Sequence, residues 1–465
     1  MQTIEIPLIG PTYQSRSAPV GNQHTKNFYI EVDPQANEQA TLMPFPGCKY
    51  FAVSGARSCR GVLEYASNVY VVSGTELYKI NSAGIATLIG TIAGTNRVGM
   101  ADDGTNLVIT VGDAKPYKYD GTTLTQGSDA DLPNSNTVIY INNRVIYDRP
   151  LGTAFADLGA PLTVNSANIL NANTDSDLNV AVAKRGQQIF AFGNKTIEPI
   201  NFTGSGTPPY ARINSAVQPV GTVSAHSVAS NKDYVYFLGS DRNVYRMQGF
   251  QSIPISNPAI GSAIEGYSVV DDAFGVCFGF DSQFFYLLTF PTEDVSWLYN
   301  QNSGLWTNLG YGVAGGAHLI AGYVYAFNKH LVIDRRNGNI YELDFETFTD
   351  NSEVIQRQRT TKTIQGKDYG MTGKTLFMSR LELIIEGGVS LVSAQSQVIM
   401  QYSDDNGQTW STERWAYIGQ QGDYGYKIEW FGLGGFVKRM FRFTMSDPIK
   451  WVLVSCNADV EVGLG

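Results

Sequence analysis

Charged side chains are scarce in this chain: Asp, Glu, Lys and Arg make up 16% of 465 residues, against about 25% in ordinary soluble domains. The Ala-, Glu-, Lys- and Leu-rich heptads that build a coiled coil are also missing. Hydrophobic residues nevertheless reach 43%, which is enough to bury a sizeable core and disfavours intrinsic disorder. Long helical assemblies and unstructured chains are therefore excluded.

Cysteine and histidine are scarce too. Cys48, Cys59, Cys277 and Cys456 form no CxxC pair, and the four histidines do not lie at the short spacings of a zinc site. We therefore expect free, buried thiols in a reducing cytosol, with no metal site and no cofactor.

Features of membrane or secreted proteins are absent as well. The first residues lack the basic and apolar regions of a signal peptide. The most apolar stretch, residues 276–290, is broken by Asp281 and Gln283 and is shorter than the roughly 20 residues a membrane helix needs. We expect no membrane anchor and a polypeptide that is soluble inside the cell when it is made.

Positive charge is in deficit, because 33 Lys and Arg residues face 42 Asp and Glu residues, for a net charge of −9. An acidic chain has no bulk electrostatic attraction for phosphates. We therefore expect no sequence-specific binding to DNA.

What the chain has in excess is glycine and aromatic residues: 48 Gly, 26 Tyr and 23 Phe. Aromatic side chains suit the pleated surface of strands, and glycine suits the turns between them. The composition favours an all-β fold.

A short pattern recurs through the first three-quarters of the chain: a β-rich run, a tight turn and a second run. Successive copies are 37 to 50 residues apart, and a propeller blade takes about 40–50. The spacing predicts a β-propeller of six or seven blades over residues 56–345, with a plain stack of β-sandwiches as the alternative. The copies are anchored at Tyr70, Val108, Val145, Ile189, Val235, Phe285 and Val332.

The second run of most copies carries a tyrosine 8 to 14 residues after the anchor. The third and fourth copies lack it and are the weakest. Residues 158–180, rich in Asn, Ala and Asp, are expected to form a long loop. The tyrosines are Tyr78, Tyr117, Tyr245, Tyr299 and Tyr341.

The composition and the hydrophobic pattern of the sequence change after residue 344. Residues 353–380 are locally basic, and several runs after them alternate apolar and polar residues, which is typical of half-buried strands. We predict a β-sandwich over residues 346–465 that includes a basic linker, 353–380. Residues 1–55 are predicted to form an N-terminal arm that packs with this C-terminal part.

One motif stands inside the predicted sandwich. Ser403, Asp405, Gly407, Thr409 and Trp410 follow the spacing S-x-D-x-G-x-T-W, which resembles the Asp-box of sialidases. The box forms a turn: its Asp bonds backbone groups, its Gly supplies a positive φ, and its Trp packs beneath.

The motif appears once, outside the repeats, and arginines within the repeats are scattered. No set of nucleophile, base and orienting group can be assembled from the sequence. We therefore predict a structural turn, no catalytic residues and no enzyme. A carbohydrate-binding or sialidase-like propeller protein remains the alternative.

Three stretches together carry a family resemblance. The first is residues 27–31 with 42–47, the second is residues 192–199, 209–213 and 235–241, and the third is residues 357–360, 379–383, 401–410 and 442–448. In this order they resemble the tail accessory, or packaged-DNA stabilisation, proteins (tail hub or nozzle proteins) of short-tailed bacteriophages.

The resemblance implies a structural virion protein of the phage tail, assembled in the host cytoplasm. Such proteins form a homo-hexameric ring below the portal and adaptor ring proteins. They extend the channel through which double-stranded DNA passes, retain the packaged DNA, and dock tailspike or fibre and needle proteins.

The basic segment suggests where a partner binds. Our hypothesis is that Arg357, Arg359 and Lys362 face a protein partner in the portal complex, while the channel wall is acidic or neutral. A solvated loop is the alternative reading of this segment.

Overall fold

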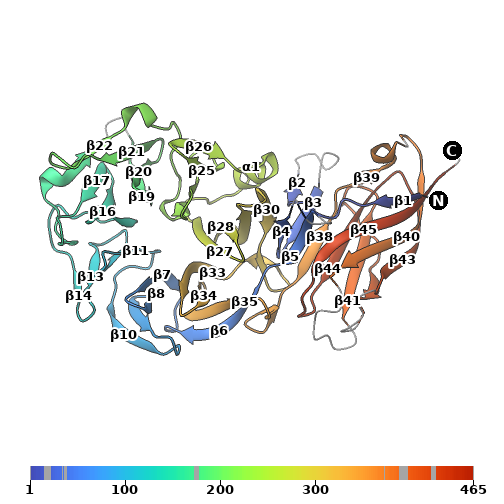
Figure 1. Ribbon diagram of the computed structural model, residues 1–465, viewed down its shortest axis with the longest axis horizontal. Coiled ribbons are helices and arrows are strands. Elements are labelled where there is room, and N and C mark those ends of the chain that lie inside the picture. The colour runs from blue at the N-terminus through green and yellow to red at the C-terminus, as the bar shows by residue number, and fades with distance from the viewer. Residues whose placement is uncertain are drawn as a thin grey trace.

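The computed structural model describes residues 2–14, 22–33, 35, 39–171, 177–370, 372–386, 396–419 and 426–463. A β-propeller forms one end of an elongated molecule and a β-sandwich forms the other, with both chain termini at the far end of the sandwich (Figure 1). No helix in these residues is long and apolar enough to cross a membrane.

Seven blades, each with four antiparallel strands, form the propeller in the described part of the chain. Blade one holds β7 (Cys59–Tyr65), β8 (Asn68–Ser73), β9 (Glu76–Ile80) and β10 (Ala86–Thr91). Blade two holds β11 (Gly99–Asp102), β12 (Leu107–Thr110), β13 (Tyr117–Tyr119) and β14 (Leu124–Gln126). Blade three holds β15 (Val138–Ile141), β16 (Arg144–Arg149), β17 (Gly152–Phe155) and β18 (Ile169–Asn171).

The next three blades continue in chain order. Blade four holds β19 (Asn179–Arg185), β20 (Gln188–Gly193), β21 (Ile197–Phe202) and β22 (Tyr210–Arg212). Blade five holds β23 (Ala229–Ser230), β24 (Val235–Leu238), β25 (Val244–Gln248) and β26 (Gln251–Pro254). Blade six holds β27 (Phe274–Phe280), β28 (Gln283–Phe290), β29 (Val295–Asn300) and β30 (Leu305–Asn308). The one α-helix in the described residues, α1 (Pro258–Glu265), lies between blades five and six.

The seventh blade is shared between the two ends of the propeller sequence. It holds β33 (Ile320–Ala326), β34 (Lys329–Asp334), β35 (Asn339–Asp344) and, as its outer strand, β6 (Gly47–Val53). The pairing of β6 with β35 closes the ring non-locally. The predicted start of the propeller at residue 56 is therefore wrong, because β6 belongs to a blade and not to the arm.

The repeat read from the sequence matches the blades one to one. All seven anchors lie in the second strand of a blade, and the five tyrosines lie in third strands. The expected loop at 158–180 holds the 3₁₀ turn η1 (Ser166–Asn168) and β18, and its residues 172–176 are outside the described residues. The repeat thus predicted the propeller and resolves to seven blades.

The sandwich has two sheets, and strands of the N-terminal arm enter both. One sheet runs β4 (Phe28–Val32), β5 (Ala40–Pro44), β45 (Leu453–Val462), β40 (Leu376–Ile385), β43 (Ile428–Phe436), with β1 (Gln2–Glu5) also on β45. The other runs β3 (Asn22–Lys26), β38 (Arg357–Thr360), β44 (Lys438–Met445), β41 (Gln397–Ser403), β42 (Arg414–Tyr417), with β2 (Tyr13–Gln14) on β3 and β39 (Ile364–Gln365) on β44.

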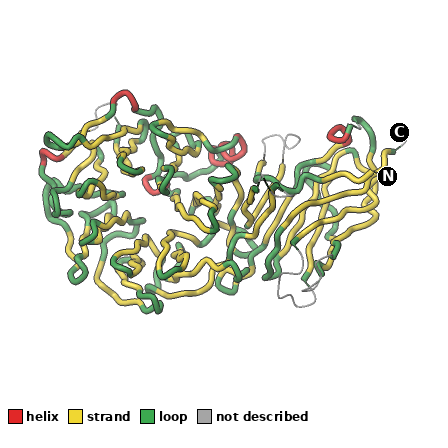
Figure 2. The backbone as a smooth tube through the Cα atoms, in the orientation of Figure 1, coloured by secondary structure: helices red, strands yellow, loops and turns green. Residues whose placement is uncertain are grey.

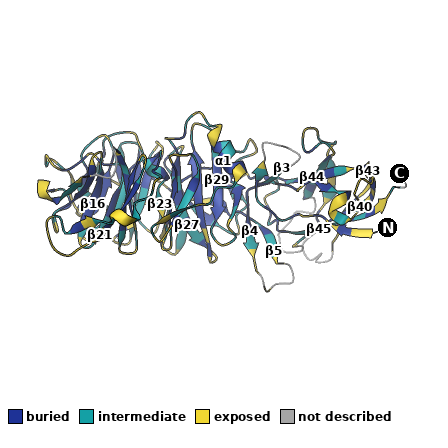
Figure 3. Cartoon of the chain, turned by 90° about the horizontal axis from the view of Figure 1, so that it is seen from above, coloured by how far each residue is buried: buried dark blue, intermediate teal, exposed yellow. Residues whose placement is uncertain are grey.

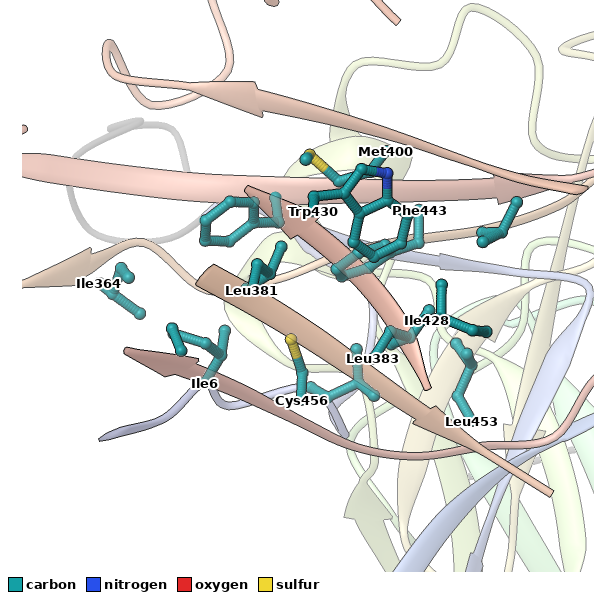
Figure 4. Packing of buried hydrophobic residues seen from close by; sticks show 14 of the residues in the cluster. Ile6, Ile364, Leu381, Leu383, Met400, Ile428, Trp430, Phe443, Leu453 and Cys456 are labelled. Carbon is teal, nitrogen blue, oxygen red and sulfur yellow. The ribbon is translucent and has the colours of Figure 1, made fainter. Parts of the chain in front are cut away.

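The facing sides of these sheets form the sandwich core. Alternate residues of a strand point to one face, so Leu381 and Leu383 of β40 point inward with Trp430 of β43 (Figure 4). Met400 and Phe443 meet them from the opposite sheet. Each such side chain contributes about 1.5–3 kcal/mol when it is fully buried, and this interior holds the sandwich together.

The propeller is stabilised by apolar layers between neighbouring blades, where buried strands line the interior (Figure 3). Tyr70 and Val72 of blade one, for example, pack with Leu107 and Ile109 of blade two. Each blade therefore buries its two faces against its neighbours, which is why the ring must close.

Propeller and sandwich are joined by one continuous sheet of eleven strands (Figure 2). Strand β30 of blade six pairs in parallel with β3 at Lys26 and Asn308. Strand β3 in turn pairs with β38, which pairs with β44. The predicted linker 353–380 is therefore largely structured: its residues 357–360 form a strand in the middle of this sheet.

The short strands after blade seven lie on the propeller side of the joint. They are β36 (Thr349–Asp350) and β37 (Glu353–Val354), and β36 pairs in parallel with β6. The remaining short elements are β31 (Gly310–Tyr311), β32 (Gly316–Ala317), η2 (Asn214–Ala216), η3 (Ala225–Ser227) and η4 (Gly366–Tyr369).

Candidate functional site

The structure brings both groups of predicted site residues to one region, the seam, which we define as β3, β30, β38 and the turn 403–410. Arg359 of β38 lies opposite Thr25 of β3. The turn reaches the same strand, because the Asn22 side-chain amide donates to the Asn406 carbonyl at 2.9 Å. The seam is therefore where the arm, the propeller and the sandwich meet.

Arg359 is fully buried and binds the N-terminal arm. Its guanidinium donates to the carbonyl oxygens of Leu8 and Pro11, to the hydroxyl of Thr25 at 2.8 Å and to the side-chain oxygen of Gln23 at 3.1 Å. Burial lowers the pKa of Arg359 to about 9. Polar groups of the chain itself thus solvate this cation, and the arm is held against β38.

Arg357, two residues earlier on the same strand, is also fully buried. Its Nη2 donates to the Phe45 carbonyl at 3.4 Å, and its guanidinium lies over the Phe348 ring at 5.6 Å. Burial lowers its pKa to about 10, against the opposing pull of Asp350. Arg357 therefore faces the propeller side of the seam.

These positions correct part of the partner hypothesis. Arg357 and Arg359 share one face of β38, and that face points into the protein, so neither guanidinium is available to a docking partner. Lys362, just beyond the strand, is exposed. Its place in an interface stays a prediction.

Two basic residues of β3 fill the other side of the seam. His24 lies between the side-chain oxygens of Asn308, at 2.9 Å, and Gln358, at 3.3 Å. Burial lowers the pKa of His24 to about 4. Burial also lowers the pKa of Lys26. The His24 imidazole therefore lies between the sixth blade and β38.

Asn27 is a functional residue that sequence reasoning missed. Its side-chain oxygen accepts from the Gly310 N–H at 2.7 Å, and its side-chain amide donates to the Gln356 carbonyl at 2.8 Å. Its φ of 60° is one that Asn tolerates better than most residues. The sequence signal is only an Asn between the polar strand β3 and the apolar-rich strand β4, which does not reveal the contact.

The Asp-box segment forms a tight turn around Asp405. The carboxylate accepts from the backbone N–H groups of Gln408 and Thr409, both at 2.9 Å, and from the hydroxyls of Ser403 and Thr409. Gly407 has a φ of 88°. Hydrogen bonds to the carboxylate, first those from Ser403, hold the pKa of Asp405 far below its usual range.

Cations pack around this turn. The Arg442 guanidinium lies 3.6 Å from the centre of the Trp410 ring. Arg439, which is buried, makes a bidentate pair with Asp404 at 2.7 Å for both contacts. Arg439 and Arg442 of β44 thus hold the turn in place, and β44 is itself part of the continuous sheet.

Metal-ligating side chains gather at one place in the described residues. Cys48, His318 and Asp350 each offer a ligand atom, and the three atoms lie within 4.8 Å of one another. The sequence predicted no such site, because the three residues are far apart along the chain.

Comparison with protein families identifies the chain. A model described as "Bacteriophage P22 Gp10, beta-propeller" matches residues 4–348, and one described as "Bacteriophage P22 Gp10, beta-sandwich" matches residues 365–461. The chain belongs to the bacteriophage P22 Gp10 family. It is a structural protein of the phage tail, as the resemblance to short-tailed phage proteins indicated.

No curated protein matches this Gp10-family chain. Among solved structures, the extracellular domain of a hybrid two-component system from B. thetaiotaomicron is 10% identical, covering 81% of this chain and 48% of its own, with a TM-score of 0.45. YCF48 bound to a D1 peptide is 6% identical, covering 64% and 97%, with a TM-score of 0.41. PorZ of Porphyromonas gingivalis is 13% identical, covering 78% and 46%, with a TM-score of 0.38.

The Gp10-family chain spans about half the length of the first of these structures. Family membership favours a structural protein over the carbohydrate-acting alternative. The single Asp-box agrees with this, since it lies in the sandwich and its carboxylate is occupied by its own turn.

One edge of the sandwich exposes a group of aromatic side chains, which we call the aromatic edge. Strands β42 and β43 end their respective sheets there and are tied by a bond from Arg414 Nη1 to the Phe431 carbonyl at 2.9 Å. All of its members are at least half exposed in the single chain. They are Trp415, Tyr417 and Phe431.

Proposed function

We propose that this chain is the repeating subunit of a tail hub or nozzle: a homo-hexameric ring below the portal and its adaptor ring. The ring extends the DNA channel, retains the packaged genome and docks tailspike or fibre and needle proteins. The protein acts structurally and not as an enzyme. Membership of the Gp10 family is the observation that carries the proposal.

The seam supports a structural role. One sheet runs from blade six through β3 and β38 into the sandwich, and Arg359 binds the arm on one side of it. A close-packed interior and a sheet that is continuous across the joint resist relative motion of the two ends. A subunit that must keep a channel aligned requires such stiffness.

The negative net charge of the chain is consistent with a channel through which DNA passes without being bound. Each contact between a lysine and a phosphate must break before the DNA can slide past. The chain has a net charge of −9, so six copies at −9 each carry −54. Such a ring repels the polyanion on average and leaves the channel free of a strong binding site.

The aromatic edge supports contact between copies. Edge strands carry unpaired backbone groups that template pairing with another chain. Exposed aromatic residues are enriched at protein interfaces. We assign this edge to the neighbouring copy in the ring.

A reconstitution experiment tests the proposal. Purified chain is added to portal–adaptor complexes, and the bound mass is measured by native mass spectrometry. We expect six copies to bind. Trp415→Ser with Phe431→Ser should reduce binding, whereas Leu88→Ser with Leu151→Ser, which removes exposed apolar residues of the propeller, should not. Absence of binding by the unaltered chain would contradict the ring proposal.

The exposed Lys362 gives a second, finer test. If this residue faces the adaptor, Lys362→Glu should weaken binding to the portal–adaptor complex more than Lys374→Glu, a control at another exposed lysine. Equal effects would remove Lys362 from the interface. Incubation with a fluorogenic sialoside and a glycan array tests the carbohydrate alternative, for which we expect neither turnover nor binding.

A further inference from the structure

Cys48, His318 and Asp350 form a buried cluster where the seventh blade meets the connection to the sandwich. Their exposed fractions are 0%, 2% and 0%. Each comes from a different segment: Cys48 from the N-terminal strand β6, His318 from the connection between blades six and seven, and Asp350 from β36. The cluster therefore joins three parts of the chain that are remote in sequence.

Backbone pairing fixes two members of the cluster side by side. Cys48 and Asp350 are direct partners in the parallel pairing of β6 with β36. The Asn351 N–H donates to the Cys48 carbonyl at 2.7 Å. Gly47 allows this approach, because a Cβ there would lie 2.5 Å from the carbonyl oxygens of Thr347 and Thr349.

The imidazole is also positioned by its surroundings. The backbone N–H of His318 donates to the Ser296 hydroxyl at 3.1 Å, and the Phe45 ring packs edge-on against the imidazole with centroids 5.8 Å apart. Its Nε2 lies 3.5 Å from Asp350 Oδ2. That separation is too long for a good hydrogen bond but suits two ligands of one metal ion.

His318 Nε2 and the Cys48 thiol both lie beside the Asp350 carboxylate, but the cluster remains short of hydrogen-bond partners. Within the described residues, neither carboxylate oxygen of Asp350 takes part in a hydrogen bond, and neither does His318 Nδ1. Buried polar groups in native proteins are nearly always satisfied, so this set of unsatisfied atoms indicates an occupant.

We propose that Cys48, His318 and Asp350 bind a structural zinc ion. Thiolate sulfur, imidazole nitrogen and carboxylate oxygen are each ligands that zinc takes, and the fourth position is left to water or to the second oxygen of Asp350. The ion would cross-link the closing strand β6, the connection between blades six and seven, and the segment leading to the sandwich.

Binding requires the thiol to lose its proton, since the thiolate is the ligand. The ion replaces that proton, which is released to solvent, and the exchange adds one positive charge beside Arg357.

The site is tested by metal analysis of the full-length chain. Protein purified without chelator should carry close to one equivalent of zinc by elemental mass spectrometry. After chelation, titration with Co²⁺ should give a thiolate-to-cobalt absorption band that saturates at one equivalent. A chain that carries no zinc and gives no band on titration overturns the proposal.

Matched variants assign the ligands. Cys48→Ser and Asp350→Asn should each lower zinc affinity by more than about 100-fold, since even second-shell changes cost 10–100-fold. Cys456→Ser removes an equally buried thiol in the sandwich core and should leave affinity unchanged. Asp350→Asn keeps the side-chain shape, and circular dichroism establishes that it folds. Unchanged affinity in folded Asp350→Asn, or the same loss in Cys456→Ser, overturns the assignment.

Discussion

The side-chain oxygen of Asn27 accepts a hydrogen bond from the backbone N–H of Gly310 at 2.7 Å, and this bond joins the N-terminal arm to the propeller just after blade six. The same side chain donates to Gln356 beside β38. One residue thus links three segments at the seam. The stability of the joint should depend on it.

Replacing Asn27 with alanine should destabilise the protein by about 2–4 kcal/mol, from two lost buried hydrogen bonds and a positive φ that alanine adopts poorly. Urea unfolding at neutral pH measures the loss. Asn143→Ala is the control, because Asn143 has a φ of 59° in an exposed turn away from the seam. An equal loss in both variants would show that backbone strain alone accounts for the effect.

Arg359→Leu should release the arm. The change removes donors to Leu8, Pro11, Thr25 and Gln23, leaving buried acceptors unpaired. We expect faster hydrogen exchange and earlier proteolytic cleavage in residues 2–14 while the blades remain protected. If hydrogen exchange rose equally in the blades, the effect of Arg359 would not be confined to the N-terminal arm.

Gly407→Ala should disturb the link between the turn and β3. A Cβ at Gly407 would lie 2.8 Å from the Asn22 side-chain nitrogen, and the φ of 88° disfavours alanine. We expect a loss of about 1–3 kcal/mol in unfolding free energy. Gly434→Ala is the control, because Gly434 has a φ of 71° and open space around it. This variant introduces backbone strain without a clash, so its loss of unfolding free energy should be smaller.

Acid should weaken the fold before its carboxylates titrate. Burial lowers the pKa of His24 to about 4 and of His226 to about 3, from an ordinary 6.5. The unfolded chain therefore binds these protons first, so stability is full above pH 6.5 and falls as the pH drops toward 4. Each histidine can contribute up to about 2 kcal/mol of loss between pH 6.5 and 5.

Unfolding free energies at pH 7 and pH 5 measure this effect. His24→Gln should reduce the difference between the two pH values, because glutamine can still bond Asn308 and does not titrate. An unchanged difference would mean that His24 is solvated and titrates normally in the folded protein.

Local patterns in the sequence were enough to predict the blades and most strands of the sandwich. The anchors mark the second strand of each blade, and the tyrosines mark the third strand of five of them, because hairpin register is set over a few residues. Closure by β6 depends on a pairing between residues about 300 positions apart, such as Cys48 with Leu343. Nothing local in the sequence indicates that pairing.

The basic segment 353–380 shows that the sequence does not reveal which face of a strand is buried. Arg357 and Arg359 alternate with Gln358, so the sequence indicates that the two arginines share a face of a strand. It does not indicate which face is buried. Their carbonyl, hydroxyl and ring partners come from the N-terminal arm and from the chain after blade seven, and only the fold brings these together.

The most direct test of the central claim is electron cryomicroscopy of the intact phage tail, at a resolution that allows this chain to be traced. We predict six copies around the DNA channel below the portal, each with its seven-bladed propeller and its sandwich in one rigid unit. A tail in which this chain is absent, or is bound as a single peripheral copy away from the channel, would contradict the account.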